Sequence, residues 1–252
     1  MKRIIFILAL FLSFLNPAFA ASAISKKEYT VSAADGFTIK STLEYKRVKG
    51  QKEYPTVVLL HSLGYSSEWW ENLPDDLMNS GYAVLMIDLR GHGRSVYNGK
   101  LVRTSWNNLT NKAYAKYPDD VIKVIEQVKS ENSKTVFFNK WAFVGSDIGA
   151  STAVMAAEKI SYKPKTIVLL SPVVQAKGLY IPVSLANLSH IDFFSISGTN
   201  DTTGKQSEEY LKRFSQSTFA IYTSESKSNG MLMLKNDKSL SKIITSWIKE
   251  YL

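Results

Sequence analysis

Alternation of apolar and polar residues is clearest in the N-terminal part of the chain. Residues 29–32 and 37–45 alternate with the two-residue period of a strand that has one buried face. Asp35 and Gly36, which lie between these stretches, form a dipeptide that favours a tight hairpin turn. The pattern therefore predicts two antiparallel strands joined by a hairpin.

Further along the chain, the apolar positions form short continuous runs instead of alternating. Runs of this length between turn residues are typical of strands that are buried on both faces of a parallel sheet. Four such strands are expected at 56–60, 83–87, 141–144 and 167–170, and two further strands at 193–197 and 219–222.

Segments with helical character lie between these runs. Pro118 followed by two aspartates is a favourable helix start, because proline fits the first turn and acids favour the positive end of the helix dipole. The alternation of strands and helices predicts one doubly wound α/β domain over residues 21–252, with a mainly parallel sheet and an antiparallel N-terminal hairpin. Its helices are expected at 67–80, 118–131, 148–160, near 205–215 and at 238–251.

Residues 1–20 read MKRIIFILALFLSFLNPAFA, which has the features of a secretory signal peptide. A basic start precedes an apolar run, and Ala18 and Ala20 place small residues at a cleavage site. The apolar run is short for a permanent membrane span, although an uncleaved anchor is the alternative. We therefore expect an exported protein, periplasmic or extracellular, that starts near Ala21 and has no stable membrane span after cleavage.

The composition narrows the available chemistry. The chain has 252 residues, no cysteine and three histidines, His61, His92 and His190. The absence of cysteine excludes disulfides, thiolate metal sites, iron–sulfur clusters and a thiol nucleophile, and three histidines leave little for a metal site. We expect neither a metal nor another cofactor.

The formal net charge is +9, and it falls to +7 once the two basic residues of the segment 1–20 are removed. The lysines are scattered among acids and serines, and the sequence contains no basic helix face or RNA-binding aromatic motif. A solvated surface is therefore expected, with no nucleic-acid partner, and the sequence does not identify a protein partner.

Three short motifs directly follow predicted strands. The segment 61–64, HSLG, is a small-residue turn that can aim backbone N–H groups at developing negative charge. The segment 88–95, DLRGHGRS, contains two glycines that let the chain turn sharply, and we expect Arg90 and His92 to hold this turn by hydrogen bonds to the backbone. The segment 198–201, GTND, precedes a predicted helix at a place suited to a carboxylate that orients a catalytic histidine.

A fourth motif, at 141–151, reads WAFVGSDIGAS and leads from a predicted strand into a predicted helix. Two glycines four residues apart around a central residue are what a strained nucleophile elbow requires. Small residues are needed two positions before and after the tip, because the strand and helix backbones nearly touch there. Gly145 and Gly149 meet this need around Asp147, whereas a tip at Ser146 would have two large neighbours. The tip is therefore Asp147.

Together and in this order, the four motifs resemble those of the α/β-hydrolase family across residues 28–252. Within this family, the chain most resembles small bacterial esterases and dienelactone-hydrolase-like members, because the stretch 171–193 leaves little room for a lid. The resemblance implies an α/β-hydrolase fold with little or no cap. It also implies an oxyanion hole formed by the backbone N–H groups of Leu63 and Ile148, and an acid position at Asp201.

The chain departs from the catalytic pattern of this family at two positions. The family combines a nucleophile at the elbow tip with a histidine base and an acid that orients the base, and here the tip is Asp147. The loop at 223–232, after the last strand, has no histidine, and Lys227 aligns with the missing base. None of the three histidines lies at the strand end that supplies the base. We expect Asp147, Lys227 and Asp201 to form a charge cluster that keeps an inherited site folded.

These features leave three hypotheses about function. The first is an exported α/β-hydrolase-family protein with a degenerate triad, catalytically inactive, that binds a small ligand or a partner. The alternative is an active, atypical carboxylic-ester hydrolase acting on esters, thioesters or lactones. A third is a scavenger alkylated once on Asp147, since haloalkane dehalogenases and epoxide hydrolases of this fold carry aspartate at the tip. Residues 101–116 show no clear periodicity and fit either a cover over the site or a solvent loop.

Overall fold

A computed structural model describes residues 23–252 of the chain. The predicted signal peptide at 1–20 lies outside the described residues, and so does the expected start near Ala21. Within the described residues, no helix is long and apolar enough to cross a membrane.

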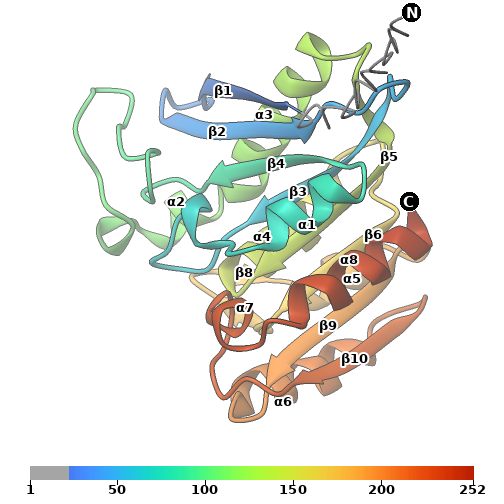
Figure 1. Ribbon diagram of the computed structural model, residues 1–252. Coiled ribbons are helices and arrows are strands. Elements are labelled where there is room, and N and C mark those ends of the chain that lie inside the picture. The colour runs from blue at the N-terminus through green and yellow to red at the C-terminus, as the bar shows by residue number, and fades with distance from the viewer. Residues whose placement is uncertain (1–22) are drawn as a thin grey trace, which may run out of the picture.

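The described part of the chain is built around an eight-stranded sheet (Figure 1). Its order is β1-β2-β4-β3-β5-β6-β9-β10, in which β2 pairs antiparallel with both β1 and β4, and every pair from β4 to β10 is parallel. The predicted mainly parallel sheet with an antiparallel N-terminal hairpin is therefore confirmed. The strands are β1 (Ile24–Ser32), β2 (Thr38–Lys46), β3 (Tyr54–Leu60), β4 (Ala83–Asp88), β5 (Val136–Ser146), β6 (Thr166–Leu170), β9 (Asp192–Gly198) and β10 (Phe219–Ser224).

Helices cover both faces of this sheet (Figure 1). Because the central strands lie between two helical layers, their side chains are apolar in both directions: Val58 and Leu60 enter one core, and Val57 and Leu59 the other. This double burial explains why the apolar runs lack alternation. One face carries α1 (Leu73–Asn79), α7 (Leu232–Asn236) and α8 (Leu240–Tyr251), and the other carries α2 (Asn111–Tyr114), α3 (Tyr117–Glu131), α4 (Ile148–Lys159), α5 (Pro182–Ala186) and α6 (Thr202–Lys212).

Several boundaries differ from the sequence prediction. Strand β1 begins five residues before the expected start at 29, because its pairing with β2 continues to Lys46. The helix expected at 67–80 is divided into a 3-10 turn, η1 (Ser67–Trp69), and α1, because Glu71 has a φ of 49°, which lies outside the right-handed helical region. Strand β5 starts earlier than expected, and its pairing with β3 shifts register at a bulge. Helix α6 starts three residues earlier than expected because Asp201 caps its N-terminus.

The stretch between β6 and β9 contains a two-stranded hairpin, β7 (Gln175–Ala176) and β8 (Leu179–Tyr180), followed by α5. These short elements pack against α4 instead of forming a separate layer above the sheet. The expectation of little or no cap is therefore confirmed.

The segment at 101–116 forms a 3-10 turn, η2 (Trp106–Asn108), and then α2. Trp106 stacks on His92 with ring centroids 5.8 Å apart, and Tyr114 Oη donates a hydrogen bond to Trp106 O at 2.7 Å. Leu101, at the tip of the preceding loop, is 79% exposed. This segment therefore packs on the turn after β4 and projects its tip into solvent.

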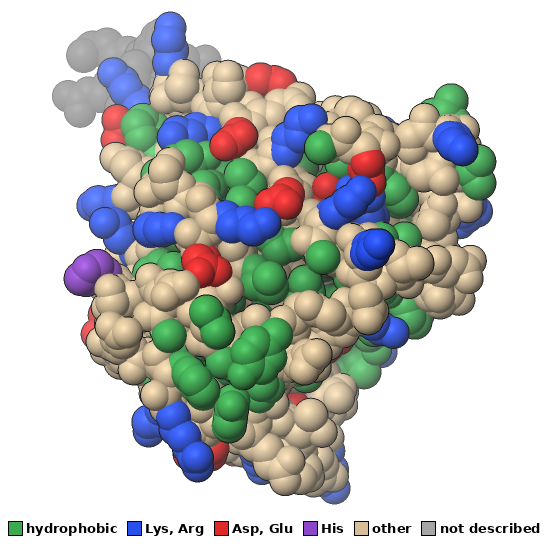
Figure 2. Space-filling view, turned by 180° about the vertical axis from the view of Figure 1, so that it is seen from behind, with side chains coloured by type: hydrophobic (Ala, Val, Ile, Leu, Met, Phe, Trp, Pro, Cys, Tyr) green, Lys and Arg blue, Asp and Glu red, His purple; other side chains and the backbone are tan. Residues whose placement is uncertain are grey.

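Charges of both signs are mixed on the face of the molecule shown in Figure 2. Lysines and arginines lie among aspartates and glutamates in its upper half, and apolar side chains gather lower in the view. On this face the excess positive charge is spread out, as in an ordinary solvated surface.

Candidate active-site cavity

The turn from β5 into α4 is a sharp elbow with Asp147 at its tip. Asp147 has a φ of 52° and a ψ of −115°, between the last residue of β5 and the first of α4. The flanking glycines are required by contact: a Cβ on Gly145 would lie 2.5 Å from Gly149 O, and a Cβ on Gly149 would overlap the carbonyl oxygen of Leu60. The glycine spacing in the sequence therefore corresponds to a close approach of strand and helix backbones.

The carboxylate of Asp147 occupies one of the two amides that would form an oxyanion hole. Its Oδ2 accepts a hydrogen bond from Leu63 N at 3.1 Å, and the Ile148 backbone amide is a second favourable partner. Burial raises the pKa of Asp147 above its ordinary value, and the charge of Asp201 raises it further, while these two amides oppose the shift. The Leu63 N–H, one of the two groups expected to stabilise an oxyanion, is thus already paired with a carboxylate.

Asp201 lies at the end of β9 and caps α6. Its Oδ1 accepts a hydrogen bond from Gly204 N at 2.9 Å, whereas its Oδ2 is buried and has no hydrogen-bond partner within the described residues. The residue is 8% exposed. In a catalytic triad the acid presents such an oxygen to the histidine base, and here no histidine meets it.

Asp147 and Asp201 line the same cavity, which has a volume of about 380 Å³. The turn after β3, the residues after β6, the start of α6 and the loop after β10 supply the other walls. The segment at 101–116 contributes none of the lining residues, so it does not cover this cavity. The lining consists of Ser62, Leu63, Tyr65, Asp147, Ser171, Val173, Asp201, Thr203, Gly204, Asn229 and Gly230.

The expected charge cluster of Asp147, Lys227 and Asp201 does not form, and that prediction was wrong. Lys227 is exposed, and within residues 23–252 it makes no ion pair and does not line the cavity. The loop packs so closely on the end of β9 that a Cβ on Gly198 would overlap Ser228 O. Asn229 and Lys227 are both exposed, but only Asn229 lines the cavity.

The next residue of this loop, Gly230, is held in place by contacts with two serines. Its N–H donates to Ser171 Oγ at 2.6 Å, and a Cβ there would lie 2.7 Å from Ser62 Oγ. Ser62 Oγ in turn lies 2.6 Å from Ser146 Oγ, directly before the elbow tip. The sequence contained no periodic signal for Ser62, Ser171 or Asn229, because all three lie in irregular segments.

The two buried histidines lock neighbouring loops to each other. His61 Nε2 accepts a hydrogen bond from Leu89 N at 2.9 Å, and His92 Nε2 accepts one from Gly64 N at 3.0 Å. Each Nδ1 faces a backbone carbonyl, at 2.8 Å and 3.1 Å, so both rings are neutral and protonated on Nδ1. Burial is the main cause that lowers the pKa of both rings, that of His92 to about 3. With His190 exposed in the turn before β9, no histidine of the described chain is free to act as a base in the cavity.

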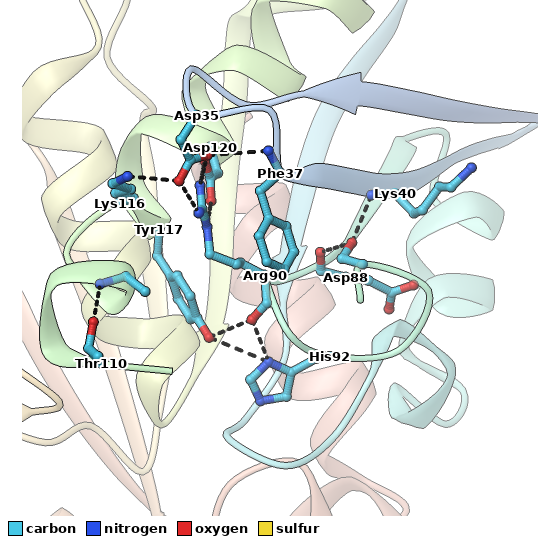
Figure 3. A network of polar contacts seen from close by, with 12 residues as sticks. Asp35, Phe37, Lys40, Asp88, Arg90, His92, Thr110, Lys116, Tyr117 and Asp120 are labelled. Atoms are coloured by element: carbon cyan, nitrogen blue, oxygen red, sulfur yellow. Dashed lines mark hydrogen bonds and ion pairs between the residues drawn. The ribbon is translucent and has the colours of Figure 1, made fainter. Parts of the chain in front are cut away.

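The turn after β4 is held by an ion-pair network (Figure 3). The Arg90 guanidinium donates to Asp35 at 2.6 and 3.0 Å and to Asp120 at 2.8 Å from each of two nitrogens. Its carbonyl accepts hydrogen bonds from Tyr117 Oη and His92 Nδ1. The expected backbone hydrogen bond is therefore present for His92, but the Arg90 side chain binds carboxylates instead of backbone.

Comparison with known protein families shows which family the chain belongs to. The family model for serine aminopeptidases of the S33 type (Hydrolase_4) matches residues 51–207. The chain belongs to this α/β-hydrolase family. The resemblance drawn from the four sequence motifs is thereby confirmed, and the matched range includes the elbow and Asp201.

Solved structures of other α/β-hydrolases have the same fold. An esterase from Pyrococcus furiosus is 15% identical and has a TM-score of 0.67, covering 90% of this chain and 91% of that one. An esterase from Exiguobacterium antarcticum is 14% identical, with a TM-score of 0.62 and coverages of 87% and 98%. A dienelactone hydrolase from Anabaena variabilis is 14% identical, with a TM-score of 0.60 and coverages of 90% and 99%. A search of curated protein sequences gave no significant match.

One buried carboxyl group of this α/β-hydrolase is not detectable from the sequence. Glu208, on α6, is 1% exposed, and its Oε1 accepts hydrogen bonds from Ser195 Oγ at 3.0 Å and Ser197 Oγ at 2.8 Å. Burial raises the pKa of Glu208 to about 7, the charge of Asp201 adds to the shift, and the two serine hydroxyls oppose it. A glutamate in a polar stretch of helix is ordinarily assigned to solvent, and only the packing of α6 on β9 reveals its burial.

The raised pKa of Glu208 makes the stability of this α/β-hydrolase depend on pH. The folded state holds the proton more tightly than the unfolded state, so the associated stability is complete below the ordinary pKa of 4.5 and is lost as the pH rises through about 7. We expect Glu208→Gln, which keeps an acceptor for both serines without the charge, to gain stability relative to the natural protein as the pH rises, by roughly 3 kcal/mol at pH 8. Urea unfolding at pH 5 and pH 8 measures this, and Glu209→Gln on the same helix is the control. A difference that stays constant between the two pH values would contradict the assignment.

The described residues contain no group of three or more His, Asp or Glu side chains arranged to hold a metal ion. The cavity itself has two carboxylates, Asp147 and Asp201, and its other polar groups are hydroxyls, an amide and backbone atoms. The chemistry of the cavity is therefore set by two acids without a lysine, arginine or histidine in the lining.

Proposed function

We propose that this α/β-hydrolase is a catalytically inactive member of its family that uses the elbow cavity to bind a small ligand. One observation carries the proposal: the Asp147 carboxylate is hydrogen bonded to the Leu63 amide, where a catalytic member would stabilise an oxyanion. A fixed negative charge at that point opposes the negative charge that develops on an ester carbonyl oxygen during attack.

The absence of a base in the cavity supports the same proposal. Ester hydrolysis on this fold needs a group that removes a proton from the nucleophile or from water. The Nε2 atoms of His61 and His92 already accept hydrogen bonds from backbone N–H groups. In the loop after β10, Asn229 lines the cavity that Asp201 also lines. An asparagine amide cannot serve as a base at neutral pH.

We expect purified chain 21–252 to leave p-nitrophenyl acetate and p-nitrophenyl butyrate unhydrolysed above the rate of a heat-denatured sample. The release of p-nitrophenol, followed by absorbance, measures this. The alternative function, an atypical carboxylic-ester hydrolase, is supported by the names of the structurally similar esterases and predicts clear turnover. Turnover that disappears in Asp147→Asn would establish that alternative, and turnover that survives this change would place a catalytic site elsewhere on the molecule.

The proposal includes export. The basic start, apolar run and small-residue cleavage site at 1–20 support a periplasmic or extracellular location. We expect the protein recovered from a bacterial host to lack these residues, with a new N-terminus near Ala21 that mass spectrometry of the intact chain identifies. A chain that keeps Met1 and remains in the cytoplasmic fraction would contradict export.

A further inference from the structure

Building on the proposed binding function, we propose that the elbow cavity takes a small organic cation whose nitrogen carries N–H donors, a primary ammonium or a guanidinium, between Asp147 and Asp201. If the proposed function fails, this inference loses its basis, but it can also fail alone. Three features support this ligand class: an unpaired buried oxygen, the charges of the lining and the kinds of side chain in the lining.

The first element is the Oδ2 atom of Asp201. Asp201 is 8% exposed, its Oδ1 is used by Gly204 N, and Oδ2 has no partner within the described residues. Buried carboxylate oxygens are ordinarily paired, since desolvating them without a donor is unfavourable. Gly204 packs directly against this carboxylate, because a Cβ at that position would overlap Oδ2. Asp201 lines the elbow cavity, so a donor bound there is the partner that this carboxylate lacks.

The second element is the charge of the cavity. Asp147 and Asp201 are both part of the lining, and their mutual repulsion contributes to the raised pKa of Asp147. No lysine, arginine or histidine of the described chain lines the cavity to offset these acids. A bound cation would remove the repulsion and supply the donor for Asp201, whereas an anionic ligand would meet two carboxylates.

The kind of cation follows from the remaining lining residues. A quaternary ammonium is ordinarily held by several aromatic rings, and Tyr65 is the one aromatic residue of the lining. A calcium ion takes six to eight oxygen ligands, and no group of three acids is arranged for a metal within residues 23–252. Two carboxylates that line one cavity instead suit a nitrogen that donates several directed hydrogen bonds. The volume of about 380 Å³ is at the lower end of the range for small-molecule pockets.

The test adds five small probes to the chain 21–252. Four share a four-carbon chain, namely n-butylammonium, n-butylguanidinium, butyltrimethylammonium and butyrate, and the fifth is calcium chloride. Isothermal titration calorimetry and the shift in thermal unfolding midpoint measure binding. We expect saturable one-site binding of n-butylammonium or n-butylguanidinium, and no saturable binding of the other three. Equal binding of butyltrimethylammonium or butyrate, or absence of binding by both N–H cations at millimolar concentration, would overturn the proposal.

Variants locate the binding site. Asp147→Asn and Asp201→Asn each keep an oxygen acceptor for the backbone amides and remove one charge, so each is expected to weaken cation binding at least about tenfold. Glu225→Gln is the matched control, because this exposed acid lies in the loop after β10 but does not line the cavity. If Asp201→Asn does not fold, Val173→Phe is the substitute, since it narrows the cavity without changing either acid and must also weaken binding. Affinity that is unchanged in the folded variants would overturn the assignment.

The same samples separate this inference from the proposed function. A protein that is silent toward p-nitrophenyl esters and does not bind the two cations contradicts the ligand class and leaves the inactive-hydrolase proposal standing. A protein that hydrolyses these esters in a manner abolished by Asp147→Asn contradicts the proposed function itself.

Discussion

Gly149→Ala is expected to prevent stable folding, or to lower the free energy of unfolding by about 4 kcal/mol or more. A Cβ on Gly149 would overlap the carbonyl oxygen of Leu60 at the end of β3. Neither backbone has room to move, since β3 lies between β4 and β5 in the sheet and is covered by a core on each face. Domains of this kind have only about 5–15 kcal/mol of stability in total. Chemical denaturation, followed by circular dichroism, measures the loss.

Gly50→Ala is the matched control for this prediction. Gly50 has a φ of 89° and no atom within 4 Å of its virtual Cβ, so the change adds backbone strain without a clash. Strain of that kind costs about 1–2 kcal/mol. If Gly149→Ala were no more destabilising than Gly50→Ala, the close approach of strand and helix at the elbow would be wrong.

The double change Asp147→Ser with Asn229→His is expected to create ester hydrolysis where the natural protein has none. Serine at the elbow tip supplies a nucleophile and frees the Leu63 amide for an oxyanion. A histidine at 229 enters the cavity that Asp201 lines, so the unpaired Oδ2 can orient it. A positioned base contributes about 10²–10⁴-fold, and we expect kcat/KM for p-nitrophenyl acetate to exceed that of Asp147→Ser alone by about this factor.

Asp147→Ser with Lys227→His is the control for the restored site. It installs the same two residue types, but position 227 is exposed and does not line the cavity. We expect it to behave like Asp147→Ser alone. Higher activity in the Lys227→His version than in the Asn229→His version would mean that the loop after β10 takes a different path from the one described here.

Much of the architecture is predictable from the sequence because its physical causes are local or periodic. The strands of the central sheet appear as continuous apolar runs since each is covered on both faces, and Asp35 with Gly36 marks the N-terminal hairpin. The elbow is visible for a related reason: contact between strand and helix forbids side chains at 145 and 149, and this leaves two glycines at a fixed spacing.

The loop after β10 shows where such reasoning ends. Alignment by position selects Lys227 for the missing base, yet Asn229 faces the cavity. The difference of two residues is set by contacts with Gly198 and Ser171, which lie far away in the chain. A loop without a repeat has no periodicity from which the direction of its side chains can be read.

The surroundings of Arg90 and Glu208 are likewise set by residues from distant parts of the chain. Arg90 was expected to bind backbone, but the fold brings Asp35 and Asp120 to its guanidinium from two other elements. Glu208 reads as a solvent-facing helical residue until α6 packs it on the serines of β9.

By itself, the sequence determined the order of strands and helices, the position of the elbow and the identity of the residue at its tip, since these depend on periodicity and on steric limits within short segments. The tertiary structure decided that Asp147 accepts the Leu63 amide, that His61 and His92 each accept a backbone N–H of the other's loop, and that Asp201 keeps one oxygen without a partner within the described residues. These properties arise from contacts between residues far apart in the chain, where hydrogen bonds and burial depend on which segments the fold brings together.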